Sequence, residues 1–209
     1  MELNKEAIEQ LDRVTRLKII NSVSGIKPAN LIGTVSEDGI TNVAIFSSVV
    51  HLGSNPPLIG FMMRPKGNVP RNTYQNIIDK GFYTINHIHP EFVERAHYTS
   101  AKFDALVSEF ERCNLTEEYV DGFKAPFVKE STFKIGLKFQ QEIKIDINNT
   151  SLIIGEIEHL IIPDNVFGKN SNIDLTSSNT VGISGLNSYY SLNKIAEHPY
   201  ARVKETPEF

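Results

Sequence analysis

A basic segment that directly precedes a candidate helix contains the residues best suited to bind a small anion. The segment from 64 to 77 reads RPKGNVPRNTYQNI, and three cations fall within its first eight residues: Arg64, Lys66 and Arg71. The chain as a whole is acidic, with a formal net charge of −4. Guanidinium groups present a fork of donors that matches a phosphate group. These residues therefore predict a site for one phosphate.

The residues that follow can supply neutral donors to the same site. Asn72 or Thr73 can cap a helix that begins here, and Gln75 stands three residues after Asn72, as the partner in a capping box does. A helix N-terminus has free N–H groups and a positive dipole end, which favour an anion. The same pattern also fits a solvated basic loop before an ordinary capped helix, so the segment leaves both interpretations open.

A second polar feature stands at the end of an apolar strand. The segment from 41 to 50 reads TNVAIFSSVV and contains the adjacent hydroxyls of Ser47 and Ser48. Since alternate residues of a strand face opposite sides, one of these serines is expected to face outward. Hydroxyls and backbone donors there could contact a flat polar ring, and two surface serines at a strand end would have the same sequence.

Composition limits the class of protein. The 209 residues are 40% hydrophobic and 22% charged, as in a soluble globular domain. Cys113 is the single cysteine, so an intrachain disulfide is impossible and a reducing compartment is favoured. The N-terminus lacks the apolar core of a signal peptide, and no stretch approaches the ~18 apolar residues of a membrane span. We therefore expect a cytoplasmic protein with neither nucleic acid nor membrane as a partner, because no run of Lys or Arg stands out.

Strands dominate the expected framework, and helices are inserted between them. The strands are expected at 30–36, 40–47, 58–63, 82–87, 135–147 and 151–162, and the helices at 5–20, 73–80, 91–97 and 104–112, with a further one capped by Thr116. Asp38-Gly39 suits a tight hairpin turn, and Gly81 suits a helix stop. In the strand from 135 to 147 the apolar residues are all expected on one face, and Gln141 is the single break. Residues 53–57 are expected to form a loop, because they contain two prolines.

These elements favour a mainly β fold with helical insertions. The hairpins indicate antiparallel pairing, and closing the sheet into a barrel removes most exposed edges. A doubly wound nucleotide-binding fold is disfavoured, because the chain has no regular βαβ alternation and no G-x-G-x-x-G. We expect no metal site, although His87, His89 and His97 could be imagined as ligands.

The order of these features resembles the flavin reductase-like family of FMN-binding split barrels. The resemblance covers about residues 25–165 and rests on short motifs in a fixed order: the Asp-Gly hairpin, Asn42, the Ser47-Ser48 pair, Asn55-Pro56-Pro57-Leu58, Arg71-Asn72-Thr73-x-x-Asn76-Ile77, Phe82-x-x-x-Asn86, a helical insert and a final long hairpin. It implies a single domain over 1–209, with the barrel at about 25–165 and a C-terminal extension at 166–209. It also implies an antiparallel split β-barrel that forms a homodimer, with FMN near the subunit interface.

The resemblance also assigns expected roles to residues of this chain. The strand from 41 to 48 would line the isoalloxazine ring, and Arg64 and the helix start would bind the phosphate. The expected contacts are Asn42, Ala44, Phe46, Ser47, Ser48, Arg64, Arg71, Asn72 and Thr73, with Asn76 supporting the turn. His97 and Ser100 would approach the ring or a nicotinamide. The family often has Arg or Phe where this chain has His97 and Tyr98, so the contacts of the hydride donor are open.

Two functions from different classes remain. The first is an NAD(P)H-dependent FMN reductase, which could supply reduced flavin to a monooxygenase or another acceptor. The flavin itself carries the hydride chemistry, so no nucleophile or general base is expected. The second is an FMN-binding electron-transfer protein without its own nicotinamide site.

Overall fold

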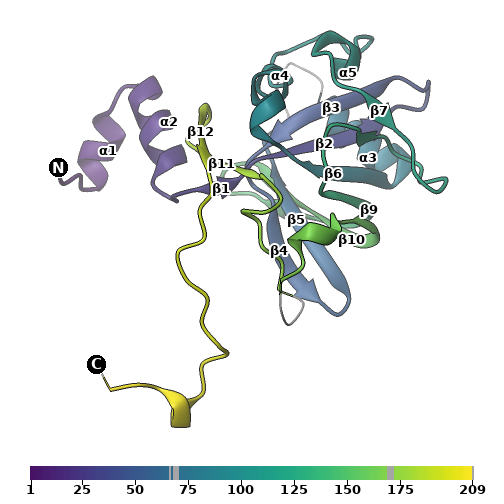
Figure 1. The fold of residues 1–209 in the computed structure, drawn as a ribbon. Helices are drawn as coiled ribbons and strands as arrows, with labels where there is room; N and C mark the ends of the chain where they lie inside the picture. Colours follow the sequence, from purple (N-terminus) through teal and green to yellow (C-terminus); the bar gives the residue numbers. More distant parts are fainter. Residues whose placement is uncertain (66, 68–70, 169–171, 209) are drawn as a thin grey trace.

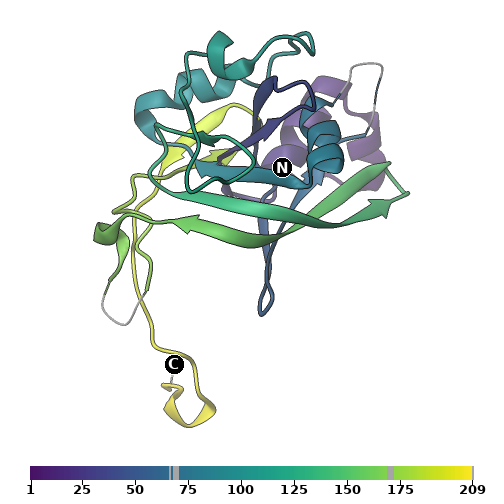
Figure 2. The same ribbon diagram turned by 90° about the vertical axis from the view of Figure 1, so that its right-hand side faces the viewer.

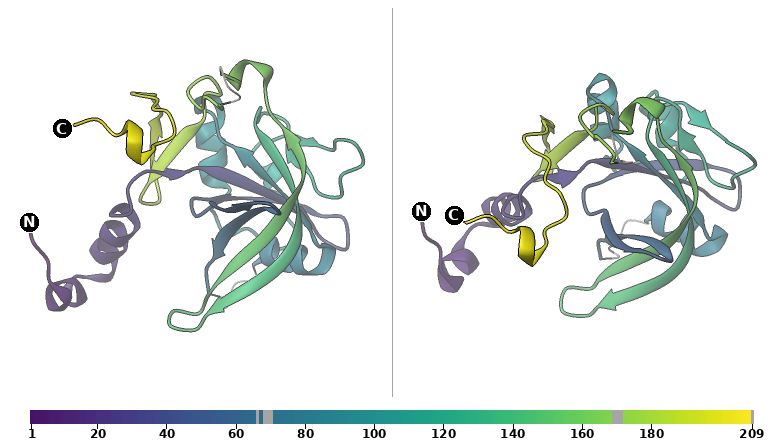
Figure 3. Two further views of the ribbon diagram at one scale, coloured as in Figure 1. Left: turned by 90° about the horizontal axis from the view of Figure 1, so that it is seen from below. Right: turned by 60° about the horizontal axis from the view of Figure 1, so that its bottom comes forward.

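Seven antiparallel strands form the body of the protein (Figure 1) in the computed structural model, which describes residues 1–65, 67, 71–168 and 172–208. Their order across the sheet is β3-β2-β6-β9-β10-β5-β4. Their bounds are β2 Asn30–Val35, β3 Thr41–Phe46, β4 Val50–Ser54, β5 Pro57–Met63, β6 Phe82–His87, β9 Lys134–Ile145 and β10 Thr150–Ile161. The sheet curls around itself (Figure 3), which is the expected split-barrel architecture.

The first hairpin agrees with its sequence. β2 pairs with β3 from Asn30 opposite Phe46 to Val35 opposite Thr41. Gly39 has φ 83°, a conformation that glycine adopts without steric cost. The turn is closed by two backbone hydrogen bonds, from Ser36 N to Ile40 O at 2.9 Å and from Gly39 N to Ser36 O at 3.2 Å. The hairpin therefore ends in a rigid tip.

The second hairpin follows directly on β3. Ser54 of β4 is paired with Pro57 of β5, so residues 53–57, expected to be a loop, form a tight turn between two strands. β4 was not predicted, because Gly53, Pro56 and Pro57 indicated a loop at its C-terminal end. β5 lies between β4 and β10, so both of its edges are paired with neighbouring strands.

The longest hairpin, β9–β10, runs across the barrel (Figure 2). Its pairing passes from Ile154 opposite Gln141 to Gly155 opposite Phe139, which leaves one extra residue in β9. Such a bulge shifts the alternation of faces. The expectation that one apolar face runs from 135 to 147 is therefore wrong: Ile143 is 44% exposed and Ile147 is 98% exposed.

Two helices precede the barrel where one was expected. α1 spans Lys5–Gln10 and α2 spans Arg13–Ser22. Asp12 breaks the run, because its carboxylate accepts from Val14 N and Thr15 N and so begins a new helix. Both helices stand clear of the sheet (Figures 1 and 3). No helix in the described part of the chain is long and apolar enough to span a bilayer.

Helix α3, Asn72–Lys80, packs against β2 and β3. It ends as expected at Gly81, which has φ 73° and donates its N–H to Ile77 O at 2.9 Å. The helix therefore has one fixed end at Gly81 and directs its other end toward the β2–β3 hairpin.

The insert after β6 contains less helix than expected. It comprises η1 Pro90–Phe92, α4 Val93–Tyr98, α5 Glu109–Arg112 and the two short strands β7 Glu117–Glu118 and β8 Phe127–Val128. The expected helix capped by Thr116 is wrong. The N–H and hydroxyl of Thr116 instead donate to the carboxylate of Glu130 across the β7–β8 pair.

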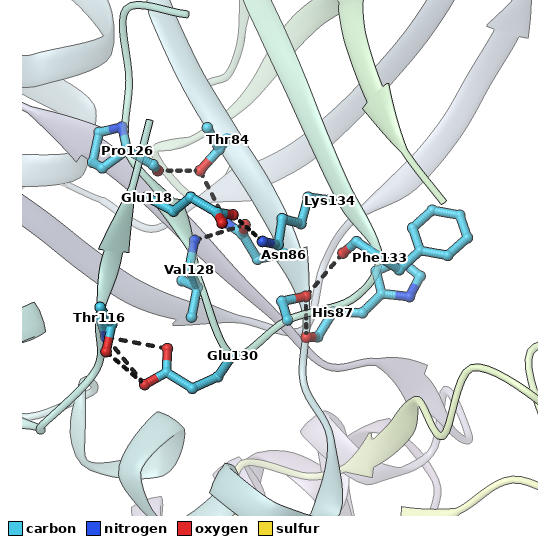
Figure 4. A network of polar contacts seen from close by, with 11 residues as sticks. Thr84, Asn86, His87, Thr116, Glu118, Pro126, Val128, Glu130, Phe133 and Lys134 are labelled. Carbon is cyan, nitrogen blue, oxygen red and sulfur yellow. Dashed lines mark hydrogen bonds and ion pairs between the residues drawn. The ribbon is translucent and has the colours of Figure 1, made fainter. Parts of the chain in front are cut away.

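A polar network attaches this insert to β6 (Figure 4). Asn86 Oδ1 accepts from Val128 N at 3.0 Å, and Thr84 Oγ1 donates to Pro126 O at 2.7 Å. Nearby, Lys134 forms an ion pair with Glu118. Since Thr84 and Asn86 are fully buried, the insert is held against the barrel by satisfied polar groups rather than by apolar contact alone.

The C-terminal part adds a small second sheet. After η2, Asp164–Val166, strand β11 Val181–Ser184 pairs with β1 Lys27–Pro28 on one side and with β12 Ser188–Ser191 on the other. Neither β11 nor β12 was predicted from the sequence. Residues after β12 extend away from the barrel (Figure 2) and include a short turn, η4 Val203–Glu205.

Two apolar clusters form the core. One lies within the barrel around Phe61, Tyr83 and Leu137. The other joins β2 and β3 to α4, α5 and β11 through Leu31, Phe110 and Ile183. The second cluster explains why the insert and the C-terminal sheet fold onto the barrel.

A close contact between Gly155 and Tyr83 yields a test of the packing in the first cluster. A Cβ added at Gly155 would overlap the Tyr83 hydroxyl, and that hydroxyl has no hydrogen-bond partner among the described residues. We expect Gly155→Ala to lower the free energy of unfolding by about 1–3 kcal/mol. Tyr83→Phe should leave it unchanged or raise it by up to about 1 kcal/mol.

Urea denaturation of both variants and of the double variant measures the coupling. Because the Phe ring removes part of the overlap, the double variant should be more stable than Gly155→Ala. Gly53→Ala is the matched control, since its nearest neighbour would lie 3.5 Å away. Strict additivity of the two changes would show that they do not meet.

Candidate functional site

Four buried polar side chains fix helix α3 against the barrel. Asn42 Nδ2 lies 3.0 Å from Thr73 Oγ1, which links β3 to the first turn of the helix. Asn76 Nδ2 donates to Thr34 Oγ1 at 3.0 Å, which links the next turn to β2. Because all four residues are buried, breaking either link would leave polar groups without water to replace the partner.

The start of α3 differs from the expected capping box. Arg71, not Asn72 or Thr73, occupies the capping position, and no side chain of the described residues caps the helix. Thr73 is instead bonded to Asn42, and Gln75 Nε2 donates to Asp79 Oδ1 at 2.8 Å. The capping prediction is wrong, because the helix already includes Asn72 and Thr73, so neither residue stands at the capping position. An uncapped helix start in a cavity is suited to an anion.

Arg71 is the strongest indication of a ligand. Its Nε atom is buried and has no hydrogen-bond partner among the described residues. A buried, unpaired guanidinium N–H is costly, because protein groups and water both fail to satisfy it. A phosphate at the helix start would supply acceptors for this group and for the first-turn N–H groups at once.

A cavity of about 490 Å³ lies in front of Arg71. It is bounded by the tip of the β2–β3 hairpin, the first two turns of α3 and the loop before α5. Its lining includes Ser36, Glu37, Asp38, Ile40, Thr41, Asn42, Arg71, Asn72, Tyr74, Asn76, Asp79 and Ala105–Val107. Arg71 and the amides of Asn42, Asn72 and Asn76 thus share one cavity with the carboxyl groups of Glu37, Asp38 and Asp79.

Arg64 lines a neighbouring cavity. This second hollow, of about 390 Å³, lies beside the β9–β10 turn and is lined by Met63, Arg64, Tyr74, Glu142, Lys144, Thr150 and Ser151 among others. Tyr74 lines both cavities, and its hydroxyl donates to Glu142 Oε2 at 3.0 Å. The expected phosphate cations Arg64 and Arg71 therefore open onto adjacent spaces that share Tyr74. Lys66 lies outside the described residues.

The strand residues expected at the ring have mixed surroundings. Ser48 Oγ donates to Met62 O and accepts from Met62 N, so this hydroxyl links the end of β3 to β5. Phe46 packs edge-on against Phe61, with ring centroids 5.0 Å apart. Ala44 and Ser47 are half-buried. Ser48 and Phe46 therefore have structural partners within the chain.

His97 and Ser100 lie apart from both cavities. His97, on α4, has its Nδ1 3.0 Å from the hydroxyl of Tyr189 on β12. Burial raises the pKa of Tyr189 to about 12, so its phenol is neutral. Ser100 is exposed just beyond α4. Within the described chain these two residues are not brought together with Arg71 or Asn42.

Glu109 is a buried carboxyl group beside β3 that the sequence did not indicate. It is 5% exposed at the start of α5, and its Oε2 accepts from Val43 N at 3.3 Å. Burial raises the pKa of its carboxyl group above the ordinary value. The neighbouring Phe110 is also buried, and nothing in the sequence distinguishes a short helix with Glu109 inside from one with Glu109 outside.

Among the described residues, no group of three or more His, Cys, Asp or Glu is placed to bind a metal. His87 is buried, stacks on Phe133 and has Nδ1 3.1 Å from Thr180 Oγ1. Burial lowers its pKa to about 4, so it is neutral near pH 7.

A curled antiparallel sheet of seven strands, with helix α3 packed on β2 and β3, defines a split barrel. The family model for the flavin reductase like domain matches residues 26–176. The chain therefore belongs to the flavin reductase-like family, which gives it a flavin cofactor and a flavin-related role in oxidoreduction or electron transfer.

Solved structures agree with this membership. A split barrel domain protein from Shewanella frigidimarina NCIMB 400 is 48% identical, with a TM-score of 0.92 over 96% of this chain and 100% of that chain. Nitrilotriacetate monooxygenase component B from Bacillus cereus is 20% identical, with a TM-score of 0.82 over 95% of this chain and 98% of that chain. Flavoredoxin of Desulfovibrio vulgaris (Miyazaki F) is 22% identical, with a TM-score of 0.72 over 84% of this chain and 92% of that chain. The last two share the fold.

The anchoring of α3 can be tested separately from ligand binding. Asn76→Ala removes the bond to Thr34 and leaves a buried hydroxyl unpaired, so we expect a loss of about 1–3 kcal/mol in the free energy of unfolding. Gln75→Ala, on the exposed side of the same helix, should change it by less than about 0.5 kcal/mol. Chemical denaturation of the two variants compares them, and equal stability would contradict an anchoring role for Asn76.

Proposed function

We propose that the protein binds FMN with the phosphate at the start of α3 and transfers hydride from NAD(P)H to the flavin. The observation that carries this proposal is the buried Nε of Arg71, which lacks a partner among the described residues and adjoins an uncapped helix start. A phosphate provides what this group lacks. Riboflavin, which has no phosphate, would not, so FMN is favoured over riboflavin.

Different residues of this chain would contact the phosphate and the ring of FMN. Arg71 and Asn72, which line the first cavity, would bind the phosphate together with Thr73 of the same turn, and Arg64 would approach it from the adjacent cavity. Ring contacts would come from Asn42, Ala44, Phe46, Ser47 and Ser48. When bound, the flavin supplies a ring that accepts a hydride at N5.

The contacts of the nicotinamide form a separate part of the proposal. His97 and Ser100 remain the candidates, on the resemblance alone. Because the Tyr189 hydroxyl bonds Nδ1 of His97, the nitrogen of that imidazole that would contact a ligand is Nε2.

We also propose a homodimer. Helix α2 stands clear of the barrel (Figure 3), and the apolar side chains of Val14 and Ile20 on it are exposed. Val23, at its C-terminal end, is 72% exposed. Exposed apolar surface of this kind is typical of protein contacts. A dimer should appear by light scattering at micromolar concentration, and a monomer would contradict this part of the proposal.

A flavin-dependent monooxygenase is the proposed acceptor of the reduced flavin. The fold shared with a nitrilotriacetate monooxygenase component B supports this choice. The second candidate function is an FMN-binding electron carrier without a nicotinamide site, which the fold shared with a flavoredoxin supports equally. A reduction experiment separates the two.

Phosphate binding at Arg71 predicts a difference between FMN and riboflavin. The Arg71→Ala, Thr73→Ala double variant should bind FMN about ten- to a hundredfold more weakly, since a hydrogen bond to a charged group is worth ~1.5–3 kcal/mol. Riboflavin affinity should be nearly unchanged. Titration of flavin fluorescence measures both ligands.

Lys80→Ala, in the last turn of α3, is the control for loss of a positive charge from this helix. Arg71→Ala alone keeps the test valid if the loss of Thr73 impairs folding. Unchanged FMN affinity in folded Arg71→Ala would put the phosphate elsewhere.

The reductase function predicts rapid reduction of bound FMN. Under anaerobic conditions, NADH or NADPH should bleach the flavin absorbance within a mixing experiment, much faster than it bleaches free FMN. Flavin that stays oxidised with either nicotinamide but bleaches with dithionite would contradict the reductase and favour the electron carrier.

A further inference from the structure

The turn that precedes α5 forms one wall of the cavity in front of Arg71, and the proposed function gives this wall no role. Ala105, Leu106 and Val107 line the cavity from this side. We propose that Leu106 contacts the dimethylbenzene half of the flavin ring and that the Ser108 hydroxyl holds the turn in place. This inference deepens the proposed FMN site and rests on the phosphate lying at Arg71.

The cavity is larger than a phosphate group requires. Its volume of about 490 Å³ is within the range of sites that enclose a drug-sized molecule, and a single phosphate group is far smaller. A phosphate at Arg71 would therefore leave room for a further part of its ligand. Because the ring and the phosphate of FMN belong to one molecule, the ring would lie within reach of the same cavity.

The elements around the cavity differ in the chemistry of their side chains. Among the described residues that line it, the β2–β3 hairpin, Arg71 and α3 supply carboxylates, amides and a guanidinium group. The turn supplies three aliphatic side chains, and Ile40 at the hairpin tip adds a fourth. An apolar wall favours contact with an apolar surface. Since the phosphate, the ribityl chain and the pyrimidine half of FMN are polar, the dimethylbenzene half is the part that this wall fits.

Leu106 presents the largest apolar surface of the turn. Its side chain is 77% exposed. A singly exposed leucine is ordinary on a protein surface, but this one lies on a turn that lines a ligand cavity. A flat apolar ring placed against Leu106 would remove this surface from water, which favours binding.

The turn is held by its own hydrogen bonds and by the residue before it. Val107 N donates to Asp104 O at 3.0 Å, and Leu106 N donates to Asp104 Oδ1 at 3.1 Å. Before the turn, Phe103 packs against the second apolar cluster. The chain itself therefore sets the position of Leu106.

Three hydrogen-bonding side chains fix the C-terminal end of the turn. Thr41 Oγ1 lies 2.7 Å from Ser108 Oγ and donates to Glu117 Oε1 at 2.5 Å. A carboxylate has no hydrogen to donate, so the single hydroxyl hydrogen of Thr41 is used by Glu117, and Ser108 donates to Thr41. Thr41 belongs to β3 and also lines the cavity, and α5 packs on the same strand (Figure 1). The turn is thus tied to the strand that borders the site.

The first test compares FMN with riboflavin in wild type, Leu106→Ala and Leu160→Ala. Because the proposed contact is to the ring, Leu106→Ala should weaken both flavins by the same factor, about five- to tenfold. Arg71→Ala, in contrast, should weaken FMN alone. Leu160→Ala is the matched control and should behave as wild type, since Leu160 is 49% exposed on β10 and lines neither cavity.

An analogue of FMN that lacks the two ring methyl groups tests which half of the ring is contacted. Wild type should bind FMN about three- to tenfold more tightly than the analogue, because the methyl groups would be covered by Leu106. In Leu106→Ala this preference should fall toward one. An equal preference in the two proteins would contradict a contact between Leu106 and the dimethylbenzene half.

The positioning role of Ser108 is tested with the same pair of ligands. Ser108→Ala should reduce the preference for FMN over the analogue, and Ser108→Thr, which keeps the hydroxyl, should retain it. In the Leu106→Ala background, Ser108→Ala should have no further effect. Amide hydrogen exchange at Leu106 and Val107 should be faster in Ser108→Ala than in wild type. If neither the exchange nor the preference changes, Ser108 does not hold the turn.

The outcomes separate this inference from the phosphate site. If wild type binds FMN more tightly than riboflavin, and folded Leu106→Ala binds both flavins as wild type does, the contact with Leu106 is wrong and the phosphate site stands. A wild type that binds FMN no better than riboflavin would overturn the phosphate site, and this inference with it.

Discussion

Two short polar links determine where helix α3 begins, and the candidate site depends on that placement. Asn42 meets Thr73 and Asn76 meets Thr34, each pair at 3.0 Å and each buried between the helix and the sheet. The helix is held by these two links and ends at Gly81, and no side chain of the described residues caps its first turn. The start of the helix, with Arg71 beside it, therefore remains open to a ligand that lies in front of the β2–β3 hairpin.

The same arrangement explains why several polar residues of the site do not contact solvent. A binding site needs donors whose directions are already set, because a side chain that must be ordered on binding costs affinity. Asn42, Thr73 and Asn76 are held by the barrel, and Ser48 is held by Met62. Arg71 is the exception, because its Nε is buried and has no hydrogen-bond partner among the described residues. Glu109 joins the helical insert to β3, because its Oε2 accepts from Val43 N at 3.3 Å.

Much of the fold could be predicted from the sequence, because hairpins carry local signals. Asp38-Gly39 located the first turn, and alternation located most of the strands. The bulge near Gln140 could not be predicted, since it depends on pairing between β9 and β10. β11 and β12 span four residues each, too few for a clear alternation pattern; β11 pairs with the edge of β1, and β12 pairs with β11. At the site, the cations before α3 were visible in the sequence. The helix begins at Asn72, one residue before the predicted start, so Arg71 occupies the capping position in place of Asn72 or Thr73. The burial of Glu109 could not be predicted, because it depends on how the insert packs against β3.

The most direct test of this account is a crystal structure of the protein with FMN bound. We predict that the phosphate lies at the first turn of α3, with the guanidinium of Arg71 and backbone N–H groups of that turn within hydrogen-bond distance. FMN bound with its phosphate away from this turn, and Arg71 still without an acceptor, would contradict the central claim.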